Sequence, residues 1–165
     1  MRSGLQIENI IVTFAAVFWK EKESNMPKFK YQDEIDMAIS QGCVLPVLHE
    51  PGGMMAYRFV FDHEHPNNFL PPLKIKPQRR LDASIRVTGY ALSCFEDKEK
   101  AKDHYANLAK TFRNIRTVIG DCLSSGIIEN NDGLVDDTLI GTSHFNLFEF
   151  EECDLSKKFE ILCKL

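Results

Sequence analysis

A long run of apolar residues at three- and four-residue steps constrains this chain more than any other feature. The run covers residues 97–126, and charged side chains fill the positions between the apolar ones. This pattern is typical of an amphipathic helix with one buried face. Asp97 is suited to cap its start and Gly126 to end it, with Gly120 as an earlier alternative. Such a helix needs a sheet against which its apolar face can pack.

Five segments are predicted to supply that sheet. Residues 84–95 carry β-branched and aromatic side chains on both faces, and Gly89 among them indicates a bulge or a close backbone approach. Residues 54–61 alternate with the strand period and place Arg58 among apolar neighbours. The other three predicted strands are residues 44–48, 145–150 and 159–165. The last two are expected to pair as a hairpin.

The predicted fold class is therefore α+β, with a mixed or antiparallel sheet of about five strands and one long amphipathic helix packed on a face. A further short helix is expected over residues 32–41, with Ile35, Ala38 and Ile39 on its inner side and Gly42 at its end. The length of 165 residues and the apolar share of 44% are those of one ordinary globular domain.

Charge and cysteine content narrow the function and the compartment. The net charge of −4 provides no general attraction to nucleic acid or to an anionic membrane, so neither partner is expected. The 5 cysteines are odd in number and include no C-x-x-C pair. They favour a reducing compartment over a disulfide scaffold, and the cytoplasm is the predicted location.

The most apolar stretch, residues 5–19, lies near the start of the chain. It is shorter than the span of about 20 residues that a membrane helix needs, and it lacks the features of a signal peptide. Two interpretations fit: a buried element, or an upstream extension that precedes a natural start at Met26. The predicted organisation is an apolar extension over residues 1–25 and a single α+β domain over residues 26–165.

A proline-rich segment, residues 62–81, is predicted to be a long loop. Ordered loops of this length in compact domains are often functional. The loop ends in a basic run whose candidate phosphate-binding residues are Lys74, Lys76, Arg79 and Arg80. The alternative is a loop that faces solvent. Any nucleic-acid binding would have to come from this basic run, because the chain as a whole is negatively charged.

The sequence His63-Glu64-His65 is a weak candidate for a metal site. Two histidines two residues apart on a strand point to the same side, and zinc would need a third ligand. The candidates for that ligand are His49, His104 and His144. The alternative is a charged strand exit that faces solvent.

Residues 89–106, which pass through Ser93, resemble a local pattern of some ADP-ribosyltransferases, in which a strand with Tyr or Ser precedes a helix. The resemblance implies that Arg58 grips the phosphates of NAD, that Ser93 supports the nicotinamide side, and that Glu149 or Glu151 polarises the ribose hydroxyl. The chain holds only Ser93 where the family has a Ser-Thr-Ser triplet.

The sequence lacks the signatures of several enzyme classes. It contains no P-loop, no G-x-G-x-x-G dinucleotide motif and no G-x-S-x-G nucleophile elbow. We therefore predict a soluble, non-catalytic binding or regulatory domain whose partner is another protein and whose surface includes the loop 62–81. An NAD-dependent ADP-ribosyltransferase-like enzyme is the first alternative, and a phosphate or nucleic-acid binder through the basic run is the second.

Overall fold

The computed structural model describes residues 27–62, 64–79, 81–82, 86–136 and 141–165. The predicted extension, residues 1–25, therefore lies outside the described residues. The same holds for His63 and Arg80 and for the first two positions of the predicted strand 84–95.

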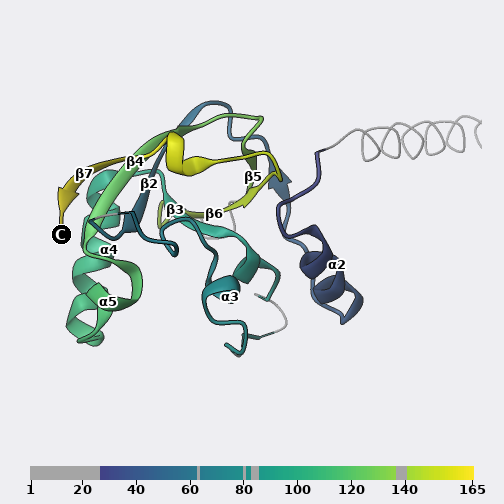
Figure 1. Ribbon diagram of the computed structural model, residues 1–165, viewed down its shortest axis with the longest axis horizontal. Coiled ribbons are helices and arrows are strands. Elements are labelled where there is room, and N and C mark those ends of the chain that lie inside the picture. Colours follow the sequence, from purple (N-terminus) through teal and green to yellow (C-terminus); the bar gives the residue numbers. More distant parts are fainter. Residues whose placement is uncertain (1–26, 63, 80, 83–85, 137–140) are drawn as a thin grey trace, which may run out of the picture.

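Within the described residues, the strands form one antiparallel sheet in the order β1-β5-β6-β3-β2-β4-β7 (Figure 1). The strands are β1 (Leu48–His49), β2 (Met54–Val60), β3 (Leu92–Phe95), β4 (Cys122–Ile128), β5 (Gly133–Asp136), β6 (His144–Glu149) and β7 (Glu160–Lys164). The α+β class is confirmed, but the sheet has seven strands instead of five. The longest ladder joins β2 to β4, from Met54 opposite Ile128 to Val60 opposite Cys122.

The described helices are α2 (Gln32–Ser40), α3 (Pro72–Ile75), α4 (Lys98–Thr111) and α5 (Ile115–Ile119). Figure 1 shows α4 and α5 near one end of the sheet and α2 beyond the other, with α3 between them. The short helix α2 was predicted, and Ile35 and Ala38 are buried as expected. Ile39, which was also assigned to its inner side, is 40% exposed.

The prediction of a single long helix over residues 97–126 is wrong. Its start is correct, because Asp97 accepts a hydrogen bond from the Lys100 N–H at 2.8 Å. However, α4 ends at Thr111, Phe112 is extended, and the shorter α5 follows. Gly120, with φ of +85°, ends α5. The last residues of the predicted helix belong to β4, where pairing with β2 overrides the helical period.

The predicted strand 84–95 is also shorter in the structure. Its described part begins with a 3₁₀ helix, Val87–Tyr90, and only Leu92–Phe95 is a strand. Gly89 lies in this 3₁₀ helix rather than in a strand bulge, and the groups that approach it are side chains rather than backbone: a Cβ atom there would lie 2.7 Å from Cγ of Leu73 in α3. Packing of this turn against α3 explains why the strand starts late.

The last two predicted strands are present as β6 and β7, but the strand 44–48 and the pairing of β6 with β7 need correction. Of residues 44–48, only Leu48 pairs, and Val44 is 72% exposed. The C-terminal hairpin is wrong, because β6 pairs with β3 and β5 whereas β7 pairs with β4. Strand period alone predicts that a segment is extended, but it does not predict the neighbour with which the segment pairs.

Three hydrophobic clusters cover the sheet. The first packs Leu92, Cys94 and Leu147 against the 153–159 segment. The second packs α2 against Phe148 and neighbouring residues, and the third packs Ala101 of α4 against Phe95. Because the helices occupy separate regions of the sheet, a recess can form between them.

The turn at Gly120 provides a test of the break that separates α5 from β4. A Cβ atom at Gly120 would collide with the carbonyl oxygen of Val60, whereas one at Gly42 would have nothing within 4 Å, although φ is +90° there. We expect Gly42→Ala to lower the free energy of unfolding by about 1 kcal/mol, and Gly120→Ala by more than about 4 kcal/mol. Urea unfolding measures both, and equal losses would contradict the packing described.

Candidate ligand pocket

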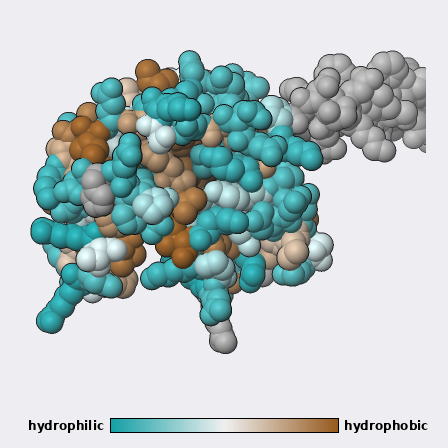
Figure 2. Space-filling model, viewed as in Figure 1, coloured by the Kyte–Doolittle hydropathy of each residue, from teal (hydrophilic) through white to brown (hydrophobic). Residues whose placement is uncertain are grey.

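A pocket of about 470 Å³ lies between the loop that follows β2 and the helices α4 and α5. Residues of β2 and β3 line it, together with Leu70, Pro72 and Ile75 of the loop and α3. Figure 2 shows apolar surface in the recess between the α4–α5 side and the α3 side of the molecule. The volume is within the range of sites that bind small molecules.

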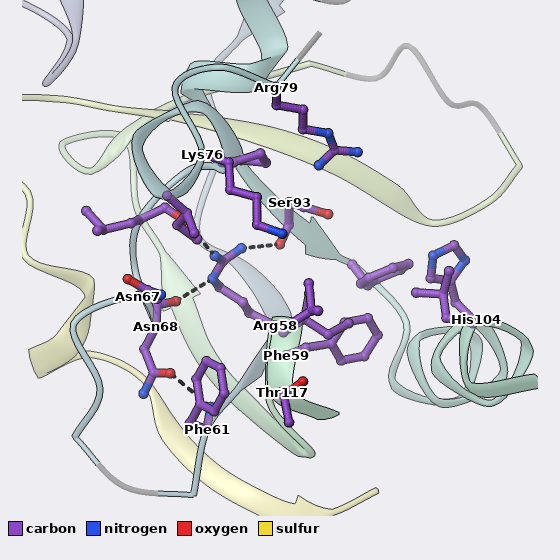
Figure 3. A pocket seen from close by; sticks show the side chains of 17 residues that line it. Arg58, Phe59, Phe61, Asn67, Asn68, Lys76, Arg79, Ser93, His104 and Thr117 are labelled. Atoms are coloured by element: carbon purple, nitrogen blue, oxygen red, sulfur yellow. Dashed lines mark hydrogen bonds between the residues drawn. The ribbon is translucent and has the colours of Figure 1, made fainter. Parts of the chain in front are cut away.

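Arg58 of β2 lines the pocket and is only 8% exposed. Its guanidinium donates hydrogen bonds to three backbone carbonyls: Nε to Asn68 at 2.8 Å, Nη1 to Ser93 at 2.8 Å and Nη2 to Leu70 at 3.3 Å. Figure 3 shows this side chain reaching between the loop and Ser93. One buried cation therefore ties the loop to β3.

The loop is held in place by further bonds near Arg58. The Asn68 side chain accepts the Phe61 N–H at 2.9 Å, and Nδ1 of His65 accepts the Asn67 N–H at 3.1 Å. The His65 ring stacks on Phe61 with centroids 4.0 Å apart. The predicted long loop is thus ordered in its described part, and α3 interrupts it.

The charge of Arg58 is stabilised by backbone dipoles and by the nearby carboxylate of Glu149. Burial lowers the pKa of its guanidinium, but a guanidinium stays protonated in proteins. Burial raises the pKa of the adjacent Cys94 thiol to about 12, so that thiol is neutral at physiological pH. The three carbonyl oxygens supply the partial negative charge that the buried cation needs.

The residues predicted from the ADP-ribosyltransferase resemblance are only partly brought together. Arg58 and Ser93 both line the pocket, but Glu149 and Glu151 do not. Glu149 is 4% exposed and binds Lys30 at 2.8 Å. Burial raises its pKa, and Lys30 and Arg58 oppose that shift. Glu151 is exposed.

Ser93 makes a contact that the sequence did not predict. Its Oγ lies 2.5 Å from Nε2 of His144, a residue considered earlier only as a third zinc ligand. The two residues lie on paired strands, where Phe95 faces His144 and Ser93 faces Asn146. The two residues are about fifty positions apart in the sequence, so only the register between β3 and β6 shows that they meet.

The Ser93–His144 pair is better suited to joining two strands than to activating a nucleophile. Nδ1 of His144 is buried and has no hydrogen-bond partner among the described residues. A buried N–H without an acceptor is rarer in proteins than an acceptor without a donor, which favours the tautomer with the proton on Nε2. In that tautomer Nε2 donates to Ser93 Oγ and cannot take its proton.

The basic run separates into two groups. Lys76 and Arg79 line the pocket, and a turn that is closed by a bond from the Arg79 N–H to the Lys76 carbonyl at 3.0 Å brings them close. Lys74 points elsewhere, because it binds Glu34 of α2 at 2.7 Å and lies 5.0 Å from the centroid of the Tyr31 ring. Arg80 lies outside the described residues.

The opposite side of the pocket is aromatic and aliphatic. Phe59 and Phe95 have ring centroids 5.3 Å apart, and the His104 ring stacks with Phe59 at 6.5 Å. Leu108 of α4 and Val118 of α5 continue this wall. The pocket therefore has a cationic side and an apolar side.

The metal prediction gains no support from the described part of the chain. No group of three or more His, Cys, Asp or Glu side chains there could hold a metal ion. His63 lies outside the described residues, and His65 uses Nδ1 to hold the loop.

Comparison with known proteins adds no family or function. No protein-family model, curated protein or solved structure matches this chain. Among the described helices, none is both long enough and apolar enough to span a bilayer.

Replacement of Arg58 tests its role in the loop. Arg58→Met would leave three carbonyls without their donor, so we expect the free energy of unfolding to fall by about 3 kcal/mol or more. Limited proteolysis should cut the loop faster in this variant. Lys102→Met, which breaks the exposed ion pair with Glu99, should change stability little. Equal effects of the two changes would contradict the anchoring role.

A pH series tests the environment of His144. Burial lowers the pKa of His144 in the folded state, so the unfolded chain binds the proton more readily. The free energy of unfolding should therefore fall as the pH drops below about 6.5. His144→Gln keeps a donor toward Ser93 and should reduce this fall, measured by urea unfolding between about pH 7.5 and about pH 5. His49→Gln, at an exposed position of β1, is the control and should behave like the wild type.

Proposed function

We propose that this chain is a non-catalytic binding domain and that its ligand occupies the pocket between the 61–79 loop and the helices α4 and α5. The observation that carries the proposal is the pocket itself, at about 470 Å³ and with walls drawn from the loop, two strands and three helices. A site with this construction is largely formed before a ligand arrives, as is usual for small-molecule sites.

The absence of an assembled reaction centre among the described lining residues supports binding over catalysis. Ser93 is the hydroxyl paired with a histidine, and the preferred tautomer of His144 does not accept its proton. Cys94 adjoins Arg58 without lining the pocket, and burial raises the pKa of its thiol to about 12, which makes it a poor nucleophile at physiological pH.

The NAD-dependent alternative draws support from Arg58 and Ser93, which lie together in the pocket lining. It also requires a carboxylate beside the ribose. Glu149 instead binds Lys30 at 2.8 Å, and Ser93 and Arg58 meet through a backbone carbonyl. We therefore favour binding and keep NAD as one of the probes.

The cysteines support the predicted location in the cytoplasm. All five are free thiols, and Cys43, Cys94, Cys122 and Cys153 are buried. Buried free cysteines behave as small apolar side chains and persist in reducing compartments.

A pocket-filling substitution tests the proposal. Val118 lines the pocket and is 38% exposed, so Val118→Trp should fill it. Phe112→Trp is the matched control, because Phe112 is 51% exposed and does not line the pocket. We expect at least one member of a set of neutral, anionic and cationic small molecules, NAD included, to raise the melting temperature of the wild type and the control. The same compound should not stabilise Val118→Trp.

Two outcomes would contradict the proposal. One is that no compound shifts the melting temperature, and the other is that the shifts in Val118→Trp equal those of the wild type. If Val118→Trp is destabilised even without ligand, Thr117→Trp offers a second way to fill the pocket from the same wall.

A further inference from the structure

Two cations extend into one side of the pocket. Lys76 and Arg79 come from the same turn, and Figure 3 shows both side chains reaching toward Ser93, beside the buried guanidinium of Arg58. Three positive charges thus line one pocket, although the chain as a whole carries a net charge of −4. The positive charge here is a local arrangement rather than a general surplus.

These charges are not neutralised by carboxylates in the pocket. No Asp or Glu is among the described lining residues. Lys74, only two positions before Lys76, has Glu34 as its partner at 2.7 Å. Within the described residues, neither Lys76 nor Arg79 has an ion pair of this kind. An anionic ligand would supply the missing counter-charge.

The apolar side of the pocket determines which uncharged group the ligand can carry. Phe59, Leu108 and Val118 present ring and aliphatic surface, and Figure 3 places Phe59, Thr117 and His104 away from the two cations. Flat apolar groups stack on aromatic rings and on aliphatic walls. The ligand that fits has a charged end and a planar apolar end.

We propose that the pocket binds a small phosphate monoester of a planar ring compound. Lys76 and Arg79 hold the phosphate, and the ring lies against Phe59, Leu108 and Val118. A phosphate group carries a charge of about −1.5 to −2 at neutral pH, which matches two cations better than a carboxylate does. Arg79 supplies a fork of donors, and Lys76 a point charge. This inference rests on the proposed function and specifies its ligand.

A comparison of four probes tests the charge requirement. Isothermal titration calorimetry measures the affinity of AMP, adenosine, phenyl phosphate and inorganic phosphate for the wild type. We expect AMP to bind at least about tenfold more tightly than either part alone, because each end of the pocket contributes. Adenosine binding as tightly as AMP would overturn the phosphate assignment. So would a failure of both AMP and phenyl phosphate to bind.

Matched loop variants locate the phosphate. Lys76→Met and Arg79→Met should each weaken AMP binding about tenfold, since each loses a charge-assisted hydrogen bond, and should leave adenosine binding unchanged. Lys74→Met removes the same kind of charge from the same loop but outside the pocket, and should bind AMP like the wild type. Equal losses in Lys74→Met and Lys76→Met would contradict a specific site.

A short oligothymidylate separates this proposal from nucleic-acid binding. If it binds more tightly than AMP and its affinity falls steeply with added salt, the site serves nucleic acid and the monoester proposal is overturned. Neutral ligands that Val118→Trp blocks, without any effect of the two charge variants, would overturn the phosphate inference but leave the binding function standing. A pocket that binds no probe would contradict both.

Discussion

The buried guanidinium of Arg58 is the interaction on which the centre of this structure depends. Within the described residues β2 and β3 share one paired couple, Tyr57 and Phe95, and next to it Arg58 bonds the Ser93 carbonyl. The same side chain bonds the carbonyls of Asn68 and Leu70. Each of these oxygens would cost about 1–3 kcal/mol if buried without a donor. The loop is consequently held to the sheet and forms a pocket wall.

The way in which the charge of Arg58 is stabilised also shapes the electrostatics of the pocket. Three backbone carbonyls bind the guanidinium directly, and the nearby carboxylate of Glu149, which does not line the pocket, also favours the charged form. Lys76 and Arg79 add positive charge from the loop. Glu149, whose pKa is raised by burial, is engaged with Lys30 rather than with the pocket. The site therefore combines cationic and apolar walls.

The outcome at residues 97–126 shows where a sequence pattern is insufficient. A helix of that length would extend about 45 Å, whereas a seven-residue strand such as β2 spans about 23 Å. A straight helix would overhang the sheet that has to cover it. The chain instead ends α4 at Thr111, turns back through α5, and returns as β4 beside β2. Cys122 and Leu123 of β4 fit the helical period of the preceding segment, and both are buried in the strand as well. Their apolar character therefore does not distinguish a helix from a strand.

Local signals in the sequence sufficed for the α+β class, for β2 and for the Asp97 cap, because alternation and capping act between near neighbours. They also marked residues 62–81 as the segment of interest. Only the tertiary structure shows that Lys74 binds Glu34 while Lys76 lines the pocket, that Glu149 pairs with Lys30 and that Ser93 contacts His144. These contacts depend on strand order, register and the course of a loop. Such features arise from contacts between distant segments, which no short pattern records.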